Sequence, residues 1–163
     1  MIGVLAEHPR RTEVTARLVE LDPDLLRDAR AMAEEAGVKG VEFVEADASD
    51  TSAYSGAVPA GVVLVCGVFG NIANGDIERT VLEIRHLCAP AATVIWTRHR
   101  RPPDLTPSIR SWFVQAGFAE LSFDIDPVLT YGVGAARLVG PPGPFRPDRT
   151  MFRFIGDGNE AHS

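Results

Sequence analysis

Residues 15–26 read TARLVELDPDLL, and this stretch decides the fold class. Thr15 to Leu21 combines β-branched and apolar side chains, which predicts a strand. Asp22 and Pro23 then predict the start of a helix, because Asp is a favoured N-cap and Pro fits the first helical position. Apolar residues at spacings of three and four continue to Ala36, and Gly37 supplies a left-handed C-cap. A strand that leads directly into a helix indicates an α/β fold.

The same alternation of apolar runs and helical periodicity recurs along the chain, and it is typical of strands buried on both faces beneath helices. Residues 2–7 have the pattern of a helix end. The most apolar run, Val62 to Cys66, suits a central strand. Asp76 and Thr106 are the predicted caps of two later helices. The remaining expected strands are 41–45, 93–97, 118–123 and 135–139.

A run of prolines and glycines, residues 141–144, cannot continue a strand. We therefore expect one Rossmann-like domain over residues 1–140 and a tail over residues 141–163. Residues 151–155 could add an edge strand, and His162 with its neighbours is predicted to be disordered.

Composition excludes several function classes. The formal net charge of −6 argues against a nucleic-acid binder, which needs clustered Lys and Arg, and favours a small-molecule substrate. No membrane span and no signal peptide are expected. The two cysteines, Cys66 and Cys88, have no zinc spacing, so we expect no metal site and a reducing, cytoplasmic location.

Two acids follow consecutive strands, at the sheet edge where open parallel sheets bind ligands. Glu20, next to Leu21, could accept hydrogen bonds from both hydroxyls of a ribose. Asp47 could accept a hydrogen bond from an adenine amino group, while the small Ala48 lets the ring approach. The alternative roles are a solvated strand-end acid for Glu20 and turn capping for Asp47.

The next two strands also end in polar or flexible residues. Cys66, Gly67 and Phe69 could line a cofactor pocket, although Cys66 and Phe69 also fit simple packing in the core. Arg98-His99-Arg100-Arg101 could hold an acidic substrate or be solvated. Three further side chains could position a substrate, namely Asn71, His99 and Tyr131.

In this order, residues 18–139 resemble the class I methyltransferases that use S-adenosylmethionine (SAM). The resemblance implies that Glu20 holds the ribose of SAM, that Asp47 contacts its adenine, and that the loop Phe69 to Ile72 borders the reacting methyl group. It also implies that the strand 135–139 runs antiparallel to the strand that starts at Phe118. Methyl transfer depends mainly on orientation, so no catalytic residue is assigned.

The chain departs from the family in one respect. No Gly-x-Gly-x-Gly precedes Glu20, so the loop that cradles the methionine part of SAM is missing together with the first strand. An N-terminal truncation or a misplaced start codon is expected. Loss of the first strand would leave two unpaired strand edges. We therefore expect this chain to bind SAM weakly or not at all.

Two other function classes stay open. A degenerate or partner-dependent domain could use the exposed sheet edges to form a homodimer without catalysis. An NAD(P)-dependent oxidoreductase would use the same acid, Glu20, but it needs the missing glycine loop and a Tyr followed by Lys four residues later. Neither Tyr54 nor Tyr131 has that Lys.

Overall fold

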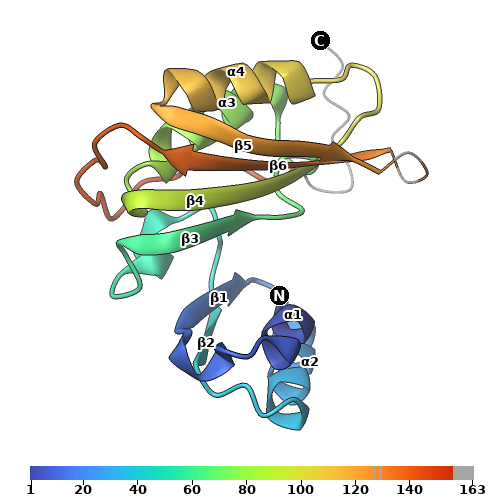
Figure 1. Ribbon diagram of the computed structural model, residues 1–163, viewed down its shortest axis with the longest axis vertical. Coiled ribbons are helices and arrows are strands. Elements are labelled where there is room, and N and C mark those ends of the chain that lie inside the picture. The colour runs from blue at the N-terminus through green and yellow to red at the C-terminus, as the bar shows by residue number, and fades with distance from the viewer. Residues whose placement is uncertain (127, 129, 156–163) are drawn as a thin grey trace. The chain divides into compact units, whose positions relative to one another are not determined.

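The chain divides into two compact units. A computed structural model describes residues 1–126, 128 and 130–155. The first unit is Met1–Ala57 with Pro147–Arg149, and the second is Val58–Arg146 with the chain from Thr150 (Figure 1). The division between Ala57 and Val58 falls inside the stretch 1–140 that the sequence suggests as one domain.

The first unit contains a parallel pair of strands, β1 (Ala16–Glu20) and β2 (Val41–Glu45). Helix α2 (Pro23–Glu35) connects them, as predicted. Asp22 caps this helix by accepting hydrogen bonds from the amides of Asp24 and Leu25, and Gly37 follows it with a φ of 65°. Three shorter elements complete the unit: α1 (Ile2–Glu7) and the 3₁₀ turns η1 (Arg11–Glu13) and η2 (Thr51–Tyr54).

The two faces of the β1–β2 pair are covered differently. On one face, Ile2 of α1 and Ala33 of α2 form a small core with Val38, against which Val41 and Phe43 pack. On the other face, the largely buried Arg17 donates hydrogen bonds to Glu42 and to the carbonyl oxygen of Ala53. The two residues are direct register partners, so this ion pair links β1 to β2 on that face.

The second unit is a four-stranded sheet in the order β3-β4-β6-β5. Strands β3 (Ala60–Val65) and β4 (Cys88–His99) are parallel, with α3 (Asn74–Ile84) between them in the chain. Helix α4 (Thr106–Gln115) precedes β5 (Phe118–Ile125), and β6 (Tyr131–Leu138) runs antiparallel to both neighbours. The predicted C-terminal antiparallel pair is therefore confirmed.

Trp96 on β4 organises the core of this second unit. Its ring lies 6.1 Å from Phe69, 6.0 Å from Phe113 on α4 and 5.7 Å from Phe123 on β5. Gly134 on β6 is its direct strand partner. Helices α3 and α4 lie together on one side of the sheet (Figure 1).

Several local predictions are wrong. Strand β3 is the terminal strand of its sheet and not a central one, so it pairs with β4 alone. Asp76 does not cap α3: it lies in the first helical turn, where its carboxylate accepts from Arg79 and from the amide of Arg153. Thr106 is already inside α4, and Asp104 accepts a hydrogen bond from its amide instead.

The tail packs against α3 and forms no regular strand among its described residues. Residues 151–155 show a single antiparallel bridge, between Phe154 and Ile72, so the expected edge strand is not confirmed. Met151 is buried, and its carbonyl oxygen accepts from Arg79 and Thr80. The predicted disorder around His162 lies outside the described residues.

No helix in the described part of the chain has the length and hydropathy needed to cross a membrane. The same residues contain no group of three or more His, Cys, Asp or Glu side chains placed to hold a metal ion.

Candidate functional site

The two acids that the sequence analysis singled out lie at the same end of the β1–β2 pair. Glu20 is the last residue of β1 and the register partner of Glu45, the last residue of β2. The pairing continues one step further, because the amide of Ala46 donates to the carbonyl oxygen of Glu20 at 3.2 Å. Asp47 follows directly. Glu20 and Asp47 therefore leave neighbouring strands at their carboxyl ends.

Each of these carboxylates is anchored to the backbone through one oxygen. Oε1 of Glu20 accepts from the amides of Leu21, at 2.8 Å, and Asp22, at 3.0 Å. Oδ1 of Asp47 accepts from the amide of Ser49 at 2.8 Å, the turn-capping bond that was the alternative reading. Within the described chain the second oxygen of each carboxylate has no hydrogen bond. Both groups can thus accept a donor from a ligand while their turns stay formed.

The loop that carries Asp47 is braced by a residue that the sequence analysis did not select. The phenol of Tyr54 donates a hydrogen bond to the carbonyl oxygen of Ala48 at 2.7 Å. Burial, together with the nearby carboxylates of Asp47 and Asp50, raises the pKa of Tyr54 to about 12. The phenol therefore stays protonated and remains a donor. An isolated tyrosine in a Ser- and Asp-rich loop carries no periodic signal that would have identified it.

The loop after β3 is held by backbone contacts. The amide of Gly67, whose φ is 74°, donates to the hydroxyl of Thr97 at 3.2 Å, and the side-chain amide of Asn71 donates to the carbonyl oxygen of Gly67 at 2.6 Å. Phe69 is fully buried, so its side chain packs in the core, which was the alternative role given to it. Cys66 is exposed, which corrects its reading as a small buried hydrophobe, and partial desolvation raises its pKa.

The basic cluster after β4 is split by its contacts. Arg98 donates to the carbonyl oxygen of Phe69, and burial lowers the pKa of its guanidinium. Arg100 pairs with Asp104 at 2.9 Å. The ring of His99 contacts that of Tyr131, its strand partner, with centroids 3.7 Å apart and ring planes tilted by 43°. Arg98 thus holds the loop after β3, whereas Arg101 is exposed, and Arg101 and the His99–Tyr131 pair remain the candidates for contact with a substrate.

The candidate residues form two groups. In the first unit, Glu20, Leu21, Asp47 and Ala48 share one end of the β1–β2 pair. In the second unit, the groups at the carboxyl ends of β3 and β4 are Cys66, Gly67, Asn71, His99 and Tyr131. Within each unit the candidate residues lie at the same end of the strands, and their assignment to a cofactor or substrate stays a prediction.

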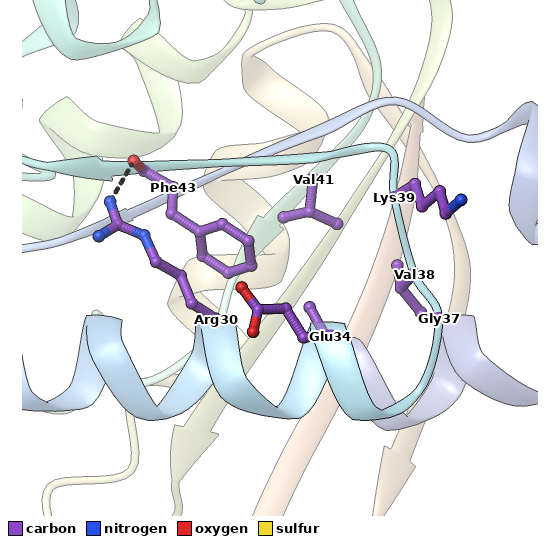
Figure 2. Close-up of a pocket in the computed structure, with 8 residues that line it drawn as sticks. Arg30, Glu34, Gly37, Val38, Lys39, Val41 and Phe43 are labelled. Carbon is purple, nitrogen blue, oxygen red and sulfur yellow. Dashed lines mark hydrogen bonds between the residues drawn. The ribbon is translucent and has the colours of Figure 1, made fainter.

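A cavity of about 470 Å³ lies between α2 and β2, away from the two acids. Val41, the first residue of β2, and Phe43 line it from the strand, Arg30 and Glu34 line it from α2, and Lys39 lies at the turn that joins the two elements (Figure 2). Arg30 donates to the carbonyl oxygen of Phe43 at 3.2 Å. Because Val41 begins the strand and Glu45 ends it, this cavity is not part of the predicted site.

Comparison with solved structures identifies the fold. An O-methyltransferase family protein from Burkholderia thailandensis matches with a TM-score of 0.58 over 84% of this chain, at 16% identity. The chain has a methyltransferase-like fold. An O-methyltransferase family 2 protein from Planctomyces limnophilus, solved with apigenin, matches with a TM-score of 0.66 over 85% of the chain, at 15% identity. A methyltransferase from Pyrococcus furiosus matches over 86%, with a TM-score of 0.57 and 15% identity.

The methyltransferase-like fold covers only part of these proteins. The chain spans 55% of the Burkholderia protein, 47% of the Planctomyces protein and 69% of the Pyrococcus protein. No family model and no curated protein matches the sequence. The similarity at these identities is one of fold: a mixed α/β architecture with parallel and antiparallel strands.

Proposed function

We propose that this chain carries the nucleoside-binding and acceptor-side parts of a SAM-dependent methyltransferase for a small-molecule substrate. The observation that supports this most is the pair of anchored carboxylates, Glu20 and Asp47, at adjacent strand ends. Each offers a second oxygen to a donor, and an adenosine presents hydroxyl and amino donors at opposite ends. The Rossmann-like layout, one strand short, and the cytoplasmic location belong to this proposal.

In this assignment Glu20 accepts from the ribose hydroxyls and Asp47 from the adenine amino group, with Leu21 and Ala48 beside them. Tyr54 holds the Asp47 loop in place through Ala48. When bound, SAM supplies an electrophilic methyl group on a sulfonium. The chain's own residues orient the acceptor: Asn71, His99 and Tyr131 lie around the strand ends of the second unit, where Gly67 and the backbone of Phe69 allow close approach.

Affinity for SAM is expected to be weak, because no Gly-x-Gly-x-Gly precedes Glu20 to hold the methionine part. Equilibrium dialysis with labelled SAM tests the proposal. The wild-type chain should bind with a dissociation constant above about 100 µM, and Glu20→Gln should weaken binding by about tenfold, the loss of one hydrogen bond to a charged group.

The matched control is Glu42→Gln on the neighbouring strand, since Glu42 pairs with Arg17 on the other face of the pair. It should leave SAM binding unchanged. Equal affinity in wild type and Glu20→Gln would refute the assignment of the ribose site. Micromolar affinity in the wild type would refute the expectation that SAM binds weakly without a glycine-rich loop for its methionine part.

A further inference from the structure

The last described residues of the tail pack into the second unit beside α3. Residues 150–155, which we call the docking segment, belong to no helix or strand. Two of their side chains nevertheless enter the core, because Met151 is 3% exposed and Phe152 is 2% exposed. The carbonyl oxygen of Met151 also accepts hydrogen bonds from Arg79, at 3.0 Å, and from Thr80, at 3.2 Å. The docking segment is therefore anchored to α3 by both packing and hydrogen bonds.

Asp76 joins the docking segment to the first turn of α3 through both oxygens of its carboxylate. Oδ1 accepts from Arg79 at 2.8 Å, and Oδ2 accepts from the backbone amide of Arg153 at 2.9 Å. Hydrogen bonds to a charged acceptor are stronger than those between neutral groups. The chain beyond Phe152 is thereby held beside the start of α3, where the loop after β3 ends.

Two contacts then tie the docking segment to this loop, residues 66–73. The backbone amide of Ile155 donates to the carbonyl oxygen of Asn71 at 2.8 Å. Phe154 forms an antiparallel bridge with Ile72, whose side chain is 2% exposed. The side-chain amide of Asn71 in turn donates to the carbonyl oxygen of Gly67 at 2.6 Å. Asn71 therefore connects the docking segment to the turn that follows β3.

The sheet holds the near end of the loop, and the docking segment holds its far end. Near the strand, the amide of Gly67 donates to the hydroxyl of Thr97, and Arg98 donates to the carbonyl oxygen of Phe69. Gly67 has a φ of 74°, a conformation that costs glycine little. The contacts of the docking segment with residues 71 and 72 complete the placement of the loop.

We propose that the docking segment is a positioning element for the loop after β3: docked on α3, it fixes where Asn71 stands at the carboxyl end of the strand. Release of the segment breaks the bond from Ile155 and the bridge from Phe154 together, so the far end of the loop can open locally. The role of Asn71 toward a methyl acceptor rests on the proposed function, whereas the positioning of the loop does not.

Amide hydrogen exchange of the full chain without SAM, followed residue by residue in NMR, tests this proposal. Ile155→Pro removes the amide that donates to Asn71, at a position whose side chain is 44% exposed. The amide of Asn71, which donates to Val68, should exchange about three- to tenfold faster, the effect of one lost hydrogen bond. Ile155→Ala is the matched control, because it shortens the same side chain but keeps the amide. It should exchange within about twofold of the wild type.

The side-chain NH₂ resonances of Asn71 give a second readout, because they report its hydrogen bond to Gly67. They should shift in Ile155→Pro and not in Ile155→Ala. The indole resonance of Trp96, which is 2% exposed, should stay in place in both variants and shows that the core is intact.

Asp76→Ala perturbs the docking segment at a different contact. It removes the acceptor for the amide of Arg153, so exchange at Arg153 and at Asn71 should both accelerate. Asp104→Ala is its control, because Asp104 likewise accepts a backbone amide at the start of a helix, that of Thr106. No hydrogen bond or ion pair joins Asp104 to the docking segment among the described residues, so exchange at Asn71 should not change.

Faster exchange at Asn71 in Ile155→Pro and Asp76→Ala, with both controls like the wild type, supports the positioning role. Unchanged exchange at Asn71 in Ile155→Pro overturns it. So does an equal acceleration in Ile155→Ala or Asp104→Ala, or one of the same size throughout the second unit. Because no SAM is present, these outcomes are independent of whether the chain binds SAM.

Discussion

Replacing Gly134 with alanine tests the packing of the second unit. A Cβ at this position would overlap the indole of Trp96, including Nε1 at 2.5 Å. The indole cannot move aside easily, because it is 2% exposed and lies among the rings of Phe69, Phe113 and Phe123. The substitution forces a buried ring or the β6 backbone to shift.

The expected cost follows from two opposing effects. Overpacking of a filled core costs about 1–3 kcal/mol. Replacing a glycine lowers the entropy of the unfolded chain and returns about 0.4–1 kcal/mol. The free energy of unfolding should therefore fall by about 1–2 kcal/mol. With a urea m-value of about 1.5 kcal/mol/M, the midpoint of unfolding should fall by about 1 M.

Urea denaturation followed by tryptophan fluorescence measures this change, since both tryptophans, Trp96 and Trp112, belong to the second unit. Gly61→Ala is the control, because a Cβ at Gly61 meets no atom within 4 Å. It should unfold at the wild-type midpoint or slightly above. Coincident midpoints for Gly134→Ala and the wild type would refute the packing of Trp96 against β6.

Three further predictions concern single residues. Asp22→Ala should destabilise the first unit by about 1 kcal/mol through loss of the α2 N-cap, and circular dichroism at 222 nm during thermal unfolding checks it; an unchanged transition would contradict the cap. Arg110 lowers the pKa of Glu120 by hydrogen bonding, so their pair should stabilise the fold above the unfolded pKa of Glu, about 4.3, and lose that contribution as the pH falls through the lower folded pKa. Glu120→Gln should abolish this part of the acid dependence and cost about 0.5 kcal/mol at pH 7, a small value because the pair is exposed. Urea titrations at several pH values measure it, and a pH dependence of stability identical to that of the wild type would exclude this role of the pair. Cys66 should react with Ellman's reagent in the folded protein, while Cys88, buried with a pKa raised to about 11, should react only after unfolding; equal rates would show that Cys88 is accessible.

Local chemistry made much of the fold predictable. The limits of α2 could be predicted from local residues alone, namely the cap at Asp22, Pro23 at the first helical position and Gly37 beyond the end. The strands of the first unit were also predictable, because their apolar runs are short and bounded. The position of Glu20 and Asp47 at adjacent strand ends was predictable too, while their role in ligand binding stays a prediction.

Features that depend on distant partners were not predictable. The apolar run of β3 reads as a central strand, but its place at the edge depends on which strands the rest of the sheet provides. Asp76 has the chemistry of a cap, yet Arg79 and the amide of Arg153, a residue of the tail, use its carboxylate instead. Asp104 and Thr106 are both residue types that cap helices, and the sequence alone does not show which of them caps α4. In the structure, Asp104 accepts a hydrogen bond from the amide of Thr106, the first residue of the helix.

The most direct test of the methyltransferase assignment is a titration of isotope-labelled protein with adenosine, followed by amide chemical shifts in NMR. We expect saturable shifts centred on Leu21, Asp22 and the loop 46–49, and smaller shifts in both Glu20→Gln and Asp47→Asn. Shifts confined to the cavity around Arg30 and Phe43, or no saturable shift up to about 10 mM adenosine, would contradict it.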